Sequence, residues 1–134
     1  MNRITAVEFR ARLEALCTQR NNPGLPRRRR DQLILLGSIV RELVPGRTYS
    51  EPDINAVIAA WLADVGRSID IDFVSLRRQL VDEGFLARDP AGNAYRLEPQ
   101  RTADLFEPET AAIDPAQAVR EARERREKRR QAHR

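Results

Sequence analysis

The chain has 134 residues, of which 41% are hydrophobic, 33% charged and 5% aromatic. This composition provides one small core with charged segments outside it. The one cysteine, Cys17, cannot form an internal disulfide, which is typical of a reducing compartment. No apolar run could span a bilayer, and the N-terminal segment lacks the pattern of a signal peptide. The sequence therefore predicts a cytoplasmic protein without membrane contact.

The positive charge is concentrated at the two ends of the chain. Residues 1–30 contain eight Arg and two Glu, and residues 115–134 contain eight Arg or Lys and three Glu, whereas residues 98–114 contain one Arg and five acids. Arginine forms bidentate contacts with phosphate or carboxylate groups. A GC-rich genome also favours Arg codons, so the arginine content alone does not identify a partner.

Residues 1–26 are predicted to form an appended helix and a linker. From Thr5 to Arg20, apolar residues recur every three or four positions and form one narrow face. The following segment, 21–26, is rich in Asn, Pro and Gly, which adopt turn conformations that a helix rejects. The helix is therefore expected to pack against a domain that begins after it.

Residues 27–98 show the pattern of a winged helix-turn-helix, a mainly α fold with a small β wing. The helix that begins at Ser50 has a strong start signal and a regular apolar face, on which Trp61 is interpreted as a structural core residue. In chain order, the predicted elements are a helix over 27–44, a short strand over 47–49, a helix after Ser50, a helix over 73–83 capped by Asp72, and a hairpin with strands over 85–88 and 94–97.

The C-terminal part of the chain is predicted to lie outside this domain. Residues 99–113 are interpreted as an acidic linker, and residues 114–134 as an Arg-rich helical tail that begins with a cap at Asp114. Because this tail has few apolar residues, it is expected to be exposed to solvent or partly frayed. Arginine-rich segments of this kind often become ordered on RNA, DNA or an acidic protein surface, and a solubilising tail is the alternative.

The segments LVPGRTYSEPDINAVI and DFVSLRRQLVDEGFLARDPAGNAYRL resemble a bacterial family described as a domain of unknown function, the 2087 family. The similarity covers about Leu25 to Leu97, and the stretch from Ser75 to Asp89 with the later Tyr-Arg pair is its specific part. The resemblance implies a winged-helix-like domain of the kind often attached to ArsR-type transcription regulators. It implies no defined activity. This chain departs from the pattern in its longer loop, 65–71, and in its charged C-terminal extension.

The helix over 73–83 occupies the position of a recognition helix, which enters the major groove in winged-helix DNA binding. At about 100° per residue, Phe73, Leu76 and Leu80 form the core face, and the outward face can read base edges. The predicted groove contacts are Ser75, Arg78 and Gln79. By contrast, Arg77 falls within the apolar arc and is interpreted as structural, paired with Glu51 or Asp53.

Further arginines are candidates for backbone contacts. On the wing these are Arg88 and Arg96, together with Asn93, which a turn role explains equally well. Four arginines at the start of the first domain helix oppose its dipole, so a partner is expected to supply negative charge; a solvated charge run is the alternative. These residues are Arg27, Arg28, Arg29 and Arg30. In the tail, the candidates are Arg125, Arg126, Arg129 and Arg130.

No catalytic or metal-binding motif stands out in the sequence. The single histidine, His133, lies next to the C-terminus, and no nucleophile–base set, metal-ligand spacing or phosphate-binding loop is present. We therefore predict a non-enzymatic protein without a cofactor, and expect a transcription regulator that binds DNA. The alternative is a protein-interaction module that docks on RNA polymerase or the ribosome, with its tail on RNA or acidic protein.

Overall fold

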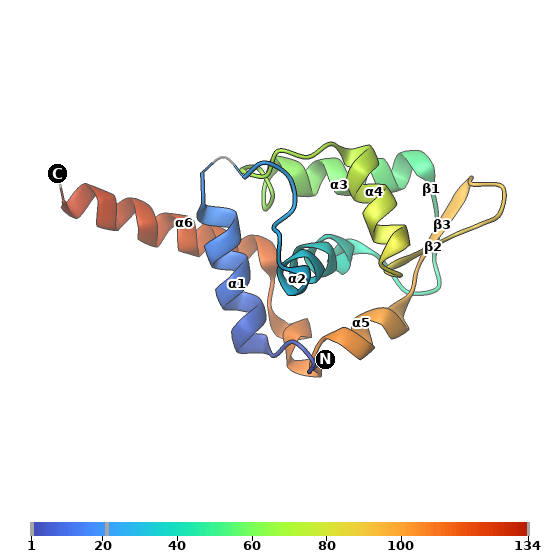
Figure 1. Ribbon diagram of the computed structural model, residues 1–134, viewed down its shortest axis with the longest axis horizontal. Coiled ribbons are helices and arrows are strands. Elements are labelled where there is room, and N and C mark those ends of the chain that lie inside the picture. Colours follow the sequence, from blue (N-terminus) through green and yellow to red (C-terminus); the bar gives the residue numbers. More distant parts are fainter. Residues whose placement is uncertain (1, 21, 134) are drawn as a thin grey trace.

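The computed structural model describes residues 2–20 and 22–133 (Figure 1). Met1, Asn21 and Arg134, which belong to the predicted N-terminal segment, linker and tail, lie outside the described residues. The α-helices are α1 Ala6–Thr18, α2 Arg29–Ile39, α3 Glu51–Ala63, α4 Phe73–Asp82, α5 Pro99–Leu105 and α6 Pro115–Ala132. The strands are β1 Thr48–Ser50, β2 Leu86–Arg88 and β3 Ala94–Leu97, and short 3-10 helices cover Val40–Glu42 and Pro108–Ala112.

The elements from α2 to β3 have the order and the sheet of a winged helix, which confirms the predicted fold. The three strands form an antiparallel sheet in the order β1-β3-β2, with Tyr49 opposite Tyr95 and Ala87 opposite Arg96. The hairpin turn is closed by Asp89, whose carboxylate accepts the backbone N–H groups of Asn93 and Ala94. The wing extends from one end of the domain (Figure 1).

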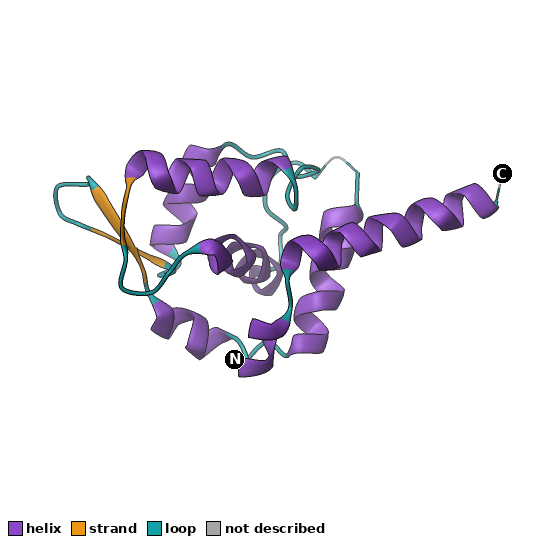
Figure 2. Ribbon diagram, turned by 180° about the vertical axis from the view of Figure 1, so that it is seen from behind, coloured by secondary structure: helices purple, strands orange, loops and turns teal. Residues whose placement is uncertain are grey.

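Helix α2 lies at the centre of the molecule, with the other helices around it (Figures 1 and 2). Its residues from Leu33 to Ile39 are all buried, as expected of a helix that is apolar on most of its surface. Trp61 of α3 is also buried, and its indole N–H donates a hydrogen bond of 2.9 Å to Ser38 Oγ of α2. This contact satisfies the indole N–H, which burial would otherwise leave unpaired, while the hydroxyl of Ser38 itself donates to the carbonyl of Leu35.

The caps of α3 and α4 are those predicted from the sequence. The hydroxyl of Ser50 accepts the N–H of Asp53, whose carboxylate accepts the N–H of Ser50 in return. Asp72 accepts the N–H of Ser75 at 2.7 Å and so fixes the start of α4. The recognition-helix position is therefore set by local hydrogen bonds as well as by packing.

Residues 99–113, predicted to be a linker, instead form α5 and a 3-10 helix that pack onto the domain. Phe106 is 4% exposed, and its ring lies against Gly37 of α2, where a Cβ would approach the ring to 2.6 Å. Ile4 pairs with Phe106 in a parallel bridge, which joins the two extensions of the domain. The segment was predicted to be a linker because it is acidic, but its few apolar residues are spaced so that they reach the core.

Helix α6 is also more firmly attached than a solvent-exposed tail. Its first half packs against α1 through small apolar residues, with Ala118 and Val119 fully buried. Beyond Arg126 the side chains are largely exposed, and this half extends away from the body of the molecule (Figure 2). Among the helices that the structure describes, none is both long and apolar enough to cross a membrane.

Candidate nucleic-acid interface

The outward face of α4 contains one arginine that is free to contact a partner. Arg78 is exposed and forms no ion pair with another described residue, while Gln79 is partly exposed beside it. Ser75 is partly exposed too, but its hydroxyl donates a 3.0 Å hydrogen bond to Asp72. The hydrogen bonds from the backbone and hydroxyl of Ser75 lower the pKa of Asp72 below its ordinary value. The N-terminus of α4 therefore carries its own negative charge.

Arg77, the neighbour of Arg78, has a different role. Its side chain is only 16% exposed, lies 2.8 Å from Glu51 and donates a hydrogen bond to Asn55 Oδ1. Glu51 is one of the two acidic partners suggested by the sequence. These contacts join α4 to α3, so only one arginine of the adjacent pair faces solvent.

The first turn of α4 differs from the prediction. Phe73 was expected on the core face, but its side chain and that of Val74 are each 41% exposed. The other two residues of the predicted core face, Leu76 and Leu80, are buried as expected. Ile69 and Ile71 of the preceding loop pack against the core in place of Phe73. The recognition helix therefore begins with an exposed apolar pair.

The wing presents two arginines on opposite faces of its hairpin. Arg96 lies opposite Ala87 and Thr48 on the outer face, and it is exposed. Arg88 lies opposite Tyr95, whose side chain faces the core, and its guanidinium group folds over the backbone of Gly92 in the turn. Neither forms an ion pair with another residue that the structure describes.

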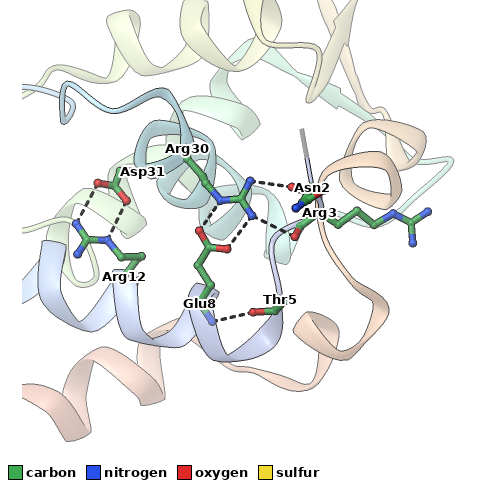
Figure 3. Close-up of polar contacts among 7 residues, drawn as sticks. All are labelled: Asn2, Arg3, Thr5, Glu8, Arg12, Arg30 and Asp31. Carbon is green, nitrogen blue, oxygen red and sulfur yellow. Dashed lines mark hydrogen bonds and ion pairs between the residues drawn. The ribbon is translucent and has the colours of Figure 1, made fainter.

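Of the four arginines at the start of α2, two are used inside the protein. Arg29 donates a 3.0 Å hydrogen bond to Glu83 Oε1, and Arg30 holds Glu8 through two hydrogen bonds (Figure 3). Arg30 also donates to the backbone carbonyls of Asn2 and Arg3, at 2.7 and 3.1 Å. For these two arginines, the negative charge that the sequence led us to expect from a partner comes from Glu83 and Glu8 of the same chain. Only Arg27 and Arg28 remain exposed without an ion pair to a described residue.

A second ion pair attaches α1 to α2 beside the first (Figure 3). Arg12 donates two hydrogen bonds to Asp31, at 2.9 and 3.0 Å, and the side chain of Asp31 is 7% exposed. The hydrogen bond with Asp31 raises the pKa of Arg12, and the hydrogen bond from Arg30 lowers the pKa of Glu8. Both pairs have the bidentate geometry that makes arginine–carboxylate contacts strong.

The tail arginines fall on two neighbouring sides of α6, with Arg126 and Arg130 on one and Arg125 and Arg129 on the other. Arg125 lies 3.0 Å from Glu14 of α1, and Arg126 donates to the hydroxyl of Thr18 at 3.3 Å. Arg130 lies 3.7 Å from Glu127, and Arg129 is exposed. The sequence therefore identified cations in this helix, but not which of them contact α1.

Sequence reasoning missed Arg123, which is more deeply placed than the tail arginines it named. It donates to the backbone carbonyls of Cys17 and Val65, at 3.3 and 3.1 Å, and lies 3.6 Å from Asp64. The available signal was its position one residue after Ala122 and four after Val119, on the side of α6 that packs against α1.

Together, the core from α2 to β3 and its exposed arginines define a winged-helix domain with a candidate nucleic-acid surface. A family model described as an uncharacterized protein conserved in bacteria (DUF2087) matches residues 24–97. The chain belongs to this family, and the match ends at β3, so α1, α5 and α6 lie outside it. No curated protein and no solved structure matches the chain.

Proposed function

We propose that the protein is a non-enzymatic transcription regulator of the bacterial cytoplasm that binds DNA through α4 and the wing. The observation that carries the proposal is the difference in environment between the adjacent side chains of Arg77 and Arg78. Arg77 is held by Glu51 and fixes the helix, whereas Arg78 is exposed and has no acidic partner among the described residues. An anchored helix with a free guanidinium group suits bidentate contact with guanine O6 and N7.

The acidic residues near this surface oppose DNA binding less than their number indicates. Glu83 lies beside both Arg29 and Arg101, and Asp89 is occupied by the N–H groups of the hairpin turn. Asp82 remains exposed on α4. Because most of the local negative charge is already compensated, exposed arginines at the edges of the surface can approach phosphates. These arginines are Arg27, Arg28, Arg88 and Arg96.

The test is selection of bound sequences from a random duplex pool, followed by affinity measurements on the selected site. Loss of one bidentate base contact costs about 1–3 kcal/mol of discrimination, or roughly 5- to 150-fold. Arg78→Ala should therefore lose the preference at one base pair and retain binding to random duplex. Arg10→Ala, an exposed arginine on α1, serves as the control and should keep the preference. If neither the wild type nor Arg78→Ala selects any sequence, the proposal is wrong.

A second candidate function, docking on RNA polymerase or the ribosome, is favoured by one observation. Phe73 and Val74 expose apolar surface at the start of α4, beside the acidic cap Asp72. Apolar side chains at an exposed helix end are more typical of a protein contact than of a phosphate contact. Under this alternative, Phe73→Ser/Val74→Ser abolishes co-sedimentation with purified ribosomes or polymerase, and Arg78→Ala has no effect on DNA binding.

A further inference from the structure

A groove of about 720 Å³ lies at the opposite end of the molecule from the wing, where three separate segments meet. Its walls are the end of α1, the connection between α3 and α4, and the middle of α6. Among the described residues, five arginines line it, and the two acidic residues in its walls are Glu124 and Glu127. The five are Arg20, Arg67, Arg123, Arg126 and Arg130. The groove therefore concentrates positive charge contributed by residues far apart in the sequence.

Arg123 forms the floor of the groove. Its side chain is 16% exposed, and its hydrogen bonds to the carbonyls of Cys17 and Val65 hold it in place. Burial and the nearby charge of Arg67 lower the pKa of Arg123 from its ordinary value. The nearest carboxylate, that of Asp64, is 3.6 Å away and 60% exposed, so it compensates this charge only in part.

The positive charges at the rim of the groove are also only partly neutralised by carboxylates of the chain. Arg126 contacts the neutral hydroxyl of Thr18, and Glu127 lies 3.7 Å from Arg130. Arg20 and Arg67 are exposed and form no ion pair with another described residue. Elsewhere in this protein, structural arginines such as Arg12 have bidentate carboxylate partners. The groove arginines lack such partners, and mutual repulsion makes their convergence unfavourable unless an anion joins them.

The shape and chemistry of the groove favour phosphate groups. The described residues that line it include no aromatic side chain on which a base could stack, so recognition would involve the backbone only. The forked guanidinium group suits phosphate oxygens. The same turns of α6 carry further exposed cations outside the groove, Lys128 and Arg129, which a small anion would not need. A long, regularly charged ligand fits this arrangement better.

We propose that this groove binds the phosphate backbone of a nucleic-acid duplex, as a contact separate from α4. The contact is independent of sequence and does not require that α4 reads DNA, so it stands if the function proposed above fails. Arg67 and Arg126 would meet phosphates at the two sides of the groove, and Lys128 and Arg129 on neighbouring faces of α6 would add positive charge beside the bound backbone. DNA and RNA share this chemistry, and the experiment distinguishes them.

The test compares the full chain with Arg67→Gln/Arg126→Gln, using fluorescence anisotropy on labelled random-sequence duplexes of DNA and of RNA. The control is Arg10→Gln/Arg120→Gln, which removes two exposed arginines from α1 and α6, the helices that border the groove, at positions outside its lining. On DNA, each lost phosphate contact reduces the slope of log K against log salt by about 0.9. The magnitude of this slope should therefore be smaller by about 1.8 in the groove variant than in the wild type. In the control variant the slope should stay close to that of the wild type.

The duplex that shows the larger loss identifies the nucleic acid. If the groove variant and the control lose the same slope and the same affinity on both duplexes, the proposal is wrong, because net charge alone would then explain binding. Arg67→Gln alone, at an exposed position without an ion pair to a described residue, repeats the test if the double variant folds poorly. Arg78→Ala should keep the full salt slope, so failure at α4 and failure at the groove give different results.

Discussion

Removal of Arg12 should destabilise the protein because it leaves a buried carboxylate without its partner. Asp31 is 7% exposed, and both of its carboxylate oxygens accept hydrogen bonds from Arg12. Breaking a buried pair from one side costs about 3–5 kcal/mol. Arg12 is itself 35% exposed, and Asp31 lies in the first turn of α2, where the helix dipole favours a negative charge. We therefore expect Arg12→Met to lose about 2–3 kcal/mol.

The double variant Arg12→Met/Asp31→Leu distinguishes the cost of an unpaired buried carboxylate from the net contribution of the ion pair to stability. Replacing both charges by apolar groups removes the unpaired carboxylate, so this variant should recover to within about 1 kcal/mol of the wild type. The assay is urea unfolding followed by the fluorescence of Trp61, the only tryptophan, together with far-ultraviolet circular dichroism. Both probes should give the same transition if α1 unfolds with the domain.

The matched control is Arg10→Met, two residues away on the same helix. Arg10 is 45% exposed and lies 3.8 Å from Glu14, so its loss should cost less than about 0.5 kcal/mol. If Arg12→Met costs no more than Arg10→Met, then the buried pair does not stabilise the attachment of α1, and the reasoning is refuted.

Three further predictions concern the two extensions. The hydrogen bond from Arg30 lowers the pKa of Glu8, so the pair stabilises the fold above the ordinary pKa of 4.5, and this contribution disappears as the pH falls. In urea unfolding at a series of pH values, the free energy of unfolding of Glu8→Gln should therefore fall less steeply at acid pH than that of the wild type. Burial raises the pKa of the Cys17 thiol to about 12, so a thiol reagent at pH 8 should modify the unfolded chain only. Above pH 9 the unfolded chain loses the thiol proton first, so the wild type should lose up to about 1.4 kcal/mol of stability per pH unit relative to Cys17→Ala. Truncation after Glu98 removes Leu105, Phe106, Ile113 and Val119, each worth about 1.5–3 kcal/mol of burial, and should unfold the chain, whereas truncation after Glu127 should leave its melting temperature almost unchanged.

Most of the winged helix was predictable because its signals are local. The caps at Ser50 and Asp72 and the turn at Asp89 each involve residues within about five positions of one another. The same is true of the different directions of Arg77 and Arg78, which follow from the 100° rotation per helical residue. Local geometry was therefore enough to find the candidate recognition face.

The remaining features depend on contacts between distant residues. Arg30 and Glu8 are 22 positions apart, and Arg29 and Glu83 are 54 apart, so the sequence could not show that half of the basic cluster is occupied. The packing of α6 rests on Ala118, Val119 and Ala122, a narrow stripe that is inconspicuous among charged residues. The arginine groove brings together three segments, and no local pattern predicts their convergence.

The contact between the two extensions has a consequence for the order in which the protein folds during synthesis. Ile4 and α1 are made first, but their partners Phe106 and α6 are made about a hundred residues later. At roughly 5–20 residues per second, translation delivers those partners about 5–20 s after α1. During this interval the apolar face of α1, including Phe9, lacks the cover that Phe106 and α6 provide in the folded chain. The segment matched by the family model is therefore complete well before the helices that cover it, and the first helix can close onto the fold only when the last has been made.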